Sequence, residues 1–291
     1  MTAANESPDF TLTFRSLSDL VSPGIYAYMT VTRVDGASSR ALMVLNRYGG
    51  DLINRPVGLF ATSLSRSDRA ALSAAIEGVD WNALPEPTKG DISAASLELE
   101  YSHGSHSVRK AFSASNLELL HALSPVMEQL DRLGGTLLAH PERAISVSVV
   151  RTNQGLKLIL RNVGTGAVLV ADPRLPSASA GTRRGSIGVA RENEASGGFR
   201  PLPTLTPVQL QPPTGPTSVL LTPGQTLEVE TVPWSPSVPG KYMAKATWID
   251  YTGPDANPNS IMPMIPDPST EPGDSRPYAI RGAAFSSYIH F

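Results

Sequence analysis

The chain has 291 residues, enough for two domains of ordinary size, and hydrophobic residues make up 41% of it, so it can bury a core. The formal net charge is −2 and no run of Lys or Arg occurs, which argues against nucleic acid as a partner. Cysteine is absent, which excludes disulfides, thiolate metal sites and cysteine nucleophiles.

The start of the chain and its hydropathy bear on where the protein is found. The opening sequence MTAANESPDF lacks both the basic stretch and the apolar stretch of a secretory signal. No apolar run approaches the length of a membrane span. We therefore expect a cytoplasmic protein that does not bind membranes, although a non-standard export route would leave the same mature sequence.

Residues 9–140 combine strand and helix patterns and predict an α+β domain. Polar and apolar side chains alternate in the first strands, and Asp35-Gly36 is typical of a hairpin turn. The segment 103–106 is expected to turn a second hairpin. The expected strands cover residues 10–14, 25–34, 41–46, 97–101 and 108–112.

Two helical segments are expected in this domain. Ser65 and Asp68 have the spacing of a capping box, and apolar residues follow at helical spacing up to Val79. A second, leucine-rich helix is expected over residues 116–133. Pro125 interrupts it, and because proline suits the first turn of a helix, two short helices are the alternative.

Residues 145–291 predict an all-β immunoglobulin-like sandwich with long proline-rich loops, because helical spacing stops at Ile145. Tyr242 and Trp248 share one face of a strand with two alanines, which favours a core position for both, and for Trp234 in the preceding turn. The expected strands cover residues 145–149, 156–160, 167–171, 187–190, 227–230, 242–248 and 283–291.

The sequence contains few candidates for chemistry. No nucleophile elbow, phosphate loop or dinucleotide fingerprint occurs. His103 and His106 lack further ligands at metal-binding spacing, so a solvated turn is the better interpretation. Arg183, Arg184 and Arg191 are expected to serve solubility rather than to form a binding patch. We therefore expect no enzyme activity, no cofactor and no metal.

Four motifs stand out in the second domain, namely a strand leading into an Asn-x-Gly turn at 160–164, a Leu-x-Pro-Gly turn at 221–224, Trp234, and a Pro-Gly-x-Tyr strand start at 239–242. With these motifs, residues 156–248 resemble the BsuPI family of intracellular proteinase inhibitors, which implies an immunoglobulin-like fold and a protease as partner. A long segment after residue 252 departs from the family pattern.

The first domain contains a Phe-x-Arg-Ser-type strand at 14–16, a Leu-Ser-x-x-Asp helix start at 64–68, an acidic and apolar hairpin, and a leucine-rich last helix. With these features, residues 10–133 resemble emfourin-type inhibitors of thermolysin-like metalloproteases. Leu17-Ser18 stands where that family has a glycine pair. The two resemblances together cover most of the chain, and neither assigns an activity.

We therefore expect a non-enzymatic protein-binding module, such as an intracellular protease inhibitor, whose partner is another protein. The first alternative is a structural or assembly subunit of a larger bacterial complex. The second is an enzyme whose site is assembled from residues distant in sequence. The expected contact surface lies in the proline-rich segment 253–277, where the apolar residues are Ile261, Met262, Met264 and Ile265.

Replacing Met262, Met264 and Ile265 together with serine tests this expected surface. If these side chains contact the partner, affinity falls, because each buried side chain contributes about 1.5–3 kcal/mol. The measurement is the partner's dissociation constant together with the melting temperature of the variant. Unchanged affinity with a lowered melting temperature would mean that the segment only covers the core.

Overall fold

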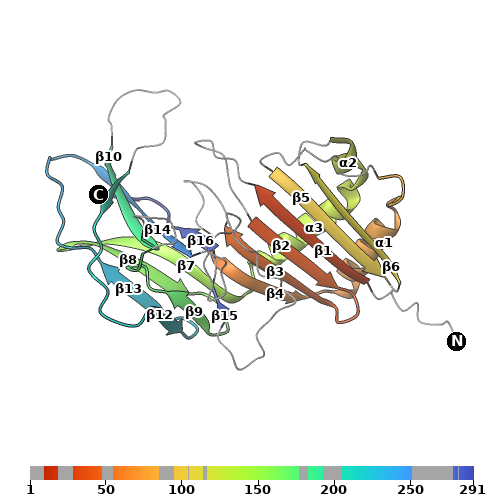
Figure 1. Ribbon diagram of the computed structural model, residues 1–291, viewed down its shortest axis with the longest axis horizontal. Helices are drawn as coiled ribbons and strands as arrows, with labels where there is room; N and C mark the ends of the chain where they lie inside the picture. The colour runs from red at the N-terminus through yellow and green to blue at the C-terminus, as the bar shows by residue number, and fades with distance from the viewer. Residues whose placement is uncertain are drawn as a thin grey trace.

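The computed structural model of the protein describes residues 10–18, 29–47, 55–84, 95–103, 105–113, 117–176, 183–192, 205–250, 278–280 and 282–291 (Figure 1). The described chain is mostly β-structure with three helices, so the prediction of a strand-rich fold is confirmed. Two lobes lie side by side (Figure 1). We call them the helical lobe and the sandwich lobe.

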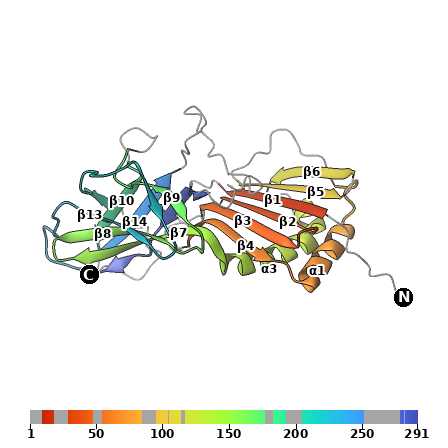
Figure 2. The ribbon, with the colours of Figure 1, turned by 90° about the horizontal axis from the view of Figure 1, so that it is seen from below.

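The helical lobe is an antiparallel sheet with helices on one face (Figure 2). Both predicted hairpins of this half occur in it, and the strands follow the order β6-β5-β1-β2-β3-β4. Its elements are β1 (Phe10–Ser18), β2 (Met29–Asp35), β3 (Arg40–Arg47), β4 (Val57–Ser63), α1 (Arg66–Glu77), β5 (Ala95–His103), β6 (His106–Ser113), α2 (Leu117–Ala122) and α3 (Ser124–Leu138).

The helices begin where their sequence signals stand. The Ser65 hydroxyl accepts a hydrogen bond from the Asp68 backbone N–H at 3.1 Å, which caps α1. The leucine-rich segment forms two helices, α2 and α3, because Pro125 lies in the first turn of α3, where its missing N–H costs nothing. None of the described helices combines the length and the apolar character needed to cross a membrane.

The core of the helical lobe lies between the sheet and the helices. Phe10, Leu12 and Phe14 alternate along β1 with side chains of the other face, and all three are buried. They belong to the same apolar cluster as Leu72 and Ile76, which are four residues apart and so lie on one face of α1. Burial of each such side chain contributes about 1.5–3 kcal/mol, so this face orients the helix on the sheet.

The sandwich lobe begins at β7 (Pro141–Thr152), and no helix occurs among the residues described between 145 and 250. One of its sheets is formed by β4, β7, β8 (Gly155–Asn162) and β13 (Thr226–Glu230). The facing one is formed by β16 (Gly282–Phe285), β14 (Tyr242–Asp250), β10 (Gly185–Arg191) and β11 (Thr206–Val208), with β17 (Ile289–His290) also paired to β14. A separate three-stranded sheet contains β12 (Ser218–Leu221), β9 (Val168–Ala171) and β15 (Tyr278–Ala279).

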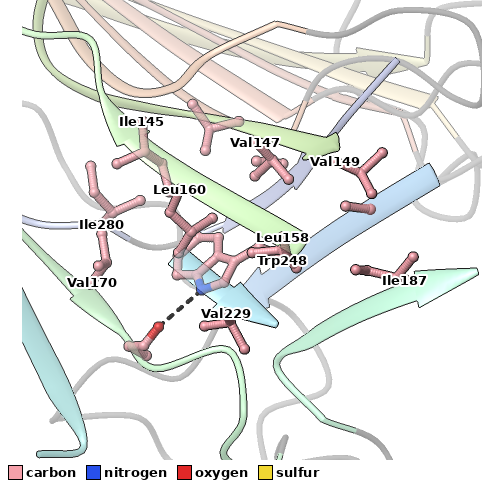
Figure 3. Packing of buried hydrophobic residues seen from close by; sticks show 14 of the residues in the cluster. Ile145, Val147, Val149, Leu158, Leu160, Val170, Ile187, Val229, Trp248 and Ile280 are labelled. Atoms are coloured by element: carbon pink, nitrogen blue, oxygen red, sulfur yellow. Dashed lines mark hydrogen bonds between the residues drawn. The ribbon is translucent and has the colours of Figure 1, made fainter. Parts of the chain in front are cut away.

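Trp248 lies at the centre of the sandwich core (Figure 3). Its side chain is fully buried, and its indole N–H donates to the Ala171 carbonyl at 3.1 Å, so the one polar atom of the ring is satisfied. Leu158, Leu160 and Val147 approach the ring from the facing sheet (Figure 3). The predicted core position of Trp248 is therefore confirmed.

Strands β3, β4 and β7 belong to both cores. In β4, Leu59 lies in the sandwich core and Phe60 in the helical core, and in β7 the same division separates Ile145 from Ala144. Neighbouring residues of a strand point to opposite faces, so the helices cover one face of these strands and the second sheet of the sandwich covers the other. Strand β7 consequently runs without interruption from Pro141 through Ile145, as part of one sheet of 14 strands among the described residues.

The end of the described chain differs from the sequence-based expectation. A single strand was expected over residues 283–291, but β16 and β17 are separated by an irregular stretch that begins at Ser286. The Ser286 hydroxyl accepts the Ala246 N–H at 2.8 Å and donates to the Ser287 carbonyl at 2.8 Å. This side chain thus replaces a backbone partner in the ladder, which local alternation does not reveal.

Gly58 should be irreplaceable at the place where the two lobes share strands. Its φ is +136°, and a Cβ there would lie 2.2 Å from the Arg143 carbonyl oxygen of the paired strand. We expect Gly58→Ala to lower the free energy of unfolding by about 3 kcal/mol or more, measured by urea denaturation.

Gly135→Ala is the matched control for this change. Gly135 lies in α3, and nothing lies within 4 Å of an added Cβ, so alanine should raise the free energy of unfolding by about 1 kcal/mol. Equal effects of the two substitutions would contradict the assignment of Gly58 as a tight contact.

Candidate functional site

The contact surface expected from sequence lies outside the described residues. Ile261, Met262, Met264 and Ile265 all fall in the segment 251–277, whose structure is not described. The candidate site must therefore come from the described part of the chain. Within that part, no group of three or more His, Cys, Asp or Glu side chains is placed to hold a metal ion.

His103 and His106 close the hairpin between β5 and β6 as directly opposed residues. The His103 side chain is exposed to solvent. The structure thus places the two histidines at a turn, in agreement with the sequence-based interpretation of this segment. They do not form part of the candidate site.

The three arginines singled out from the sequence, Arg183, Arg184 and Arg191, lie at two different places. Arg184 pairs with Asp250 at 3.0 Å, and Arg183 donates to the Leu210 carbonyl at 3.2 Å. Both contacts hold in place the backbone that directly precedes β10. Arg191 lies at the other end of β10, about 20 Å away for a strand of this length. The first two arginines are thus structural, which differs from the solubility role that we expected for them.

Asp172 forms a buried ion pair with Arg174. Its carboxylate is 1% exposed and receives two side-chain N–H groups of Arg174, from Nη2 at 2.6 Å and from Nε at 2.9 Å, together with the Arg174 backbone N–H at 2.8 Å. Burial raises the pKa of Asp172, but these hydrogen bonds and the guanidinium charge outweigh it and hold the pKa below its usual value. Such a carboxylate stays ionised and holds the chain between β9 and β10 in place.

Asn162 joins two turns at one end of the sandwich. Its side-chain N–H groups donate to the carbonyls of Gly166 and Leu221, both at 2.9 Å, and its side-chain oxygen accepts the Gly164 N–H at 2.9 Å. Its backbone carbonyl accepts the Gly224 N–H at 3.0 Å. This fully buried residue therefore holds the Asn-x-Gly and Leu-x-Pro-Gly turns together.

The opposite end of the sandwich carries a cluster of aromatic side chains, Trp234, Tyr242 and Phe291. The Trp234 ring meets Tyr242 and Phe291 nearly at right angles, with centroids 6.4 and 6.3 Å away, and the last two rings stack at 6.2 Å. Tyr242 is almost fully buried, whereas Trp234 and Phe291 are half-buried. We call this end of the lobe the distal surface.

Two arginines complete the distal surface. The Arg151 guanidinium lies 4.8 Å from the centre of the Phe291 ring, within the range of a cation–π contact. Arg191 donates from Nη2 to the Pro239 carbonyl at 3.0 Å and crosses Gly240, where a Cβ would lie 2.6 Å from its Nε. Gly240 has a φ of +155°, so its position favours glycine both in backbone and in space.

Two exposed valines lie in the connection from β13 to β14, which also carries Trp234. Val232 is 36% exposed and Val238 is 48% exposed, which makes them two of the few large apolar side chains that the described residues leave open to solvent. The Tyr242 hydroxyl donates to the Val238 carbonyl at 2.8 Å and fixes the valine beside the aromatic cluster. Tryptophan, tyrosine and arginine beside apolar side chains are the residue types that dominate the energetics of protein interfaces.

Part of this arrangement could not be found from sequence. A core position was predicted for both Trp234 and Tyr242. Tyr242 is in the core as predicted, whereas Trp234 is only half-buried and packs against the core from outside. Arg151 and Phe291 are separated by 140 positions and carry no shared local signal. The pairing of β7 with β8 and of residue 291 with Tyr242 brings them together.

Comparison of the chain with protein-family models, with curated proteins and with solved structures finds no match.

Replacement of Asp172 tests whether its buried ion pair is structural. We expect Asp172→Asn to lower the free energy of unfolding at pH 7 by about 1–3 kcal/mol, because Arg174 loses its charged partner. The contribution of a carboxylate with a lowered pKa is complete above its unfolded pKa of about 3.9 and is lost as the pH falls through the folded pKa. The difference between wild type and variant should therefore narrow below about pH 4.

Asp131→Asn is the control for this experiment, since Asp131 is exposed on α3 and should change stability little at any pH. Urea denaturation followed at several pH values gives both comparisons. A pH-independent difference between wild type and Asp172→Asn would contradict the ion-pair interpretation.

Proposed function

We propose that the protein is a non-enzymatic protein-binding module and that the distal surface makes contact with its partner. The observation that carries this proposal is the combination of half-buried Trp234 and Phe291 with exposed Val232 and Val238 at one end of the sandwich. Apolar and aromatic side chains that stay exposed at the end of a rigid lobe cost solvation free energy, which a binding partner would recover.

The scaffold behind this surface suits recognition. Three parts of the backbone meet there: the β7–β8 hairpin, the connection from β13 to β14, and Phe291, which follows β17. The Trp234 backbone N–H donates to the Gln154 carbonyl at 3.0 Å. Tyr242 exchanges two backbone hydrogen bonds with Phe291 at 2.8 and 2.9 Å. A surface whose backbone is already held in place loses little entropy on binding.

We further propose that the sandwich lobe is an immunoglobulin-like domain and that the helical lobe is an α+β domain which shares strands β3, β4 and β7 with it, with protease inhibition as the specific activity. The motifs that resemble the BsuPI inhibitors support this proposal by their positions. Asn162 links two of them at one end of the sandwich, and Trp234 and Tyr242 contact each other at the other end.

Substitution of the two valines tests the proposed surface. A tagged form of the protein is used to capture its partner from native lysate, and the identified partner is then titrated against Val232→Ser/Val238→Ser. We expect the dissociation constant to rise about tenfold, since about 1.5 kcal/mol of apolar burial is lost. If the partner is a protease, inhibition of its activity should weaken by the same factor.

Leu220→Ser is the matched control, because Leu220 is 49% exposed and lies on β12, away from the distal surface. It should leave the dissociation constant unchanged. Equal affinity of the wild type and the valine double variant would refute the distal surface as the contact. Light scattering would reveal the assembly-subunit alternative as a large particle instead of a discrete small oligomer.

A further inference from the structure

We propose that the distal surface recognises an acidic segment of the partner, one in which carboxylates alternate with apolar side chains. This inference rests on the proposed function and adds the chemistry of the partner to it. It follows from the charges around the aromatic cluster and from the way in which the structure fixes them.

Three basic side chains lie at the distal surface in the part of the chain that the structure describes. Arg151, Arg191 and Lys241 are all exposed, and they are linked through neighbouring contacts to Tyr242 and Phe291. The whole chain has a formal net charge of −2, so the positive charge here is local and does not follow from composition. A local excess of one sign attracts the opposite sign and repels like charge.

Glu192, the residue that follows Arg191, already has a partner. The Glu192 carboxylate contacts the imidazole of His290, and its backbone N–H donates to the Lys241 carbonyl at 2.9 Å. Among the described residues, Glu192 therefore forms no ion pair with Arg151, Arg191 or Lys241.

Both arginines are held in position before any partner arrives. The Arg151 guanidinium rests against the Phe291 ring, and Arg191 is fixed across Gly240 by its bond to the Pro239 carbonyl. A guanidinium has five N–H donors, so that single bond leaves several donors of Arg191 for a carboxylate. Arginine that is already ordered loses less entropy when it binds a carboxylate in bidentate geometry.

The aromatic cluster and the valines supply the second part of the recognition. Trp234 and Phe291 are half-buried beside Arg151, and Val238 is exposed beside Tyr242. A ligand with carboxylates alone would leave these apolar groups in water, and a purely apolar ligand would leave the arginines unpaired. A segment in which the two kinds of side chain alternate satisfies both.

The test uses a fluorescein-labelled peptide of alternating glutamate and leucine and its counterpart of alternating glutamine and leucine. Fluorescence anisotropy with the full chain should give a dissociation constant at least about tenfold lower for the glutamate peptide. Raising the salt concentration should weaken the binding of that peptide, since exposed charges are screened. Free glutamate at the same carboxylate concentration should not compete, because it lacks the apolar side chains.

Two double variants locate the interaction. Arg151→Ala/Arg191→Ala should raise the dissociation constant of the glutamate peptide about tenfold or more. The control is Arg132→Ala/Arg161→Ala, which removes two exposed arginines of α3 and β8 and should change it little. If the first variant fails to fold, judged by circular dichroism, Lys241→Glu replaces it, because Lys241 is exposed and its substitution should also weaken binding.

The outcomes separate this inference from the proposed function. Equal affinity for the two peptides, or an equal loss in the two double variants, would overturn the acidic segment as ligand. If capture of the native partner still depends on Val232 and Val238 in that case, the distal surface remains the contact and only its charge preference is wrong. If neither the valine variant nor the arginine variant changes the dissociation constant of the native partner, the proposed function is wrong as well.

Discussion

Strands β3, β4 and β7 are buried on both faces, and the arrangement of the two lobes depends on this constraint. A strand covered on both sides needs apolar side chains at successive positions, which is why residues 57–60 read VGLF. It also needs room for close backbone approach, and Gly58 supplies that room beside Arg143 and Ala144. The helices and the second sheet can each cover their own face of these strands because neither competes for the same side chains.

The two ends of the sandwich are closed by different interactions. At one end the turns are joined by hydrogen bonds to Asn162, a fully buried polar residue whose donors and acceptor are all used. At the other end closure is made by aromatic rings and an arginine, which fill space but leave apolar edges in contact with water. The first kind of closure favours stability. The second leaves exposed apolar groups that a partner could cover.

The sequence predicted those features that depend on neighbouring residues. Alternation gave most strands of both lobes but missed β4, β11, β12 and β15. The Ser65 cap gave the start of α1, and Pro125 gave the division between α2 and α3. Pairing across long distances was beyond such reasoning: nothing near β9 indicates that it leaves the sheet of β8 to pair with β12 and β15. The distal surface is of this second kind, since Arg151 meets Phe291 only after β7, β14 and the end of the chain have been brought together.

The pairing of β7 with β4 has a practical consequence for the separate expression of the two lobes. A recombinant fragment starting near residue 141 would contain β7 without β4. The edge of β7 that pairs with residues 57–60 in the full chain would then have no partner strand. Val57 and Leu59 would also be missing from the sandwich core. An open, apolar strand edge promotes aggregation, so fragments cut at this position should be prone to precipitate. A fragment that keeps β4 in reach of β7, for instance by circular permutation, would avoid this fault.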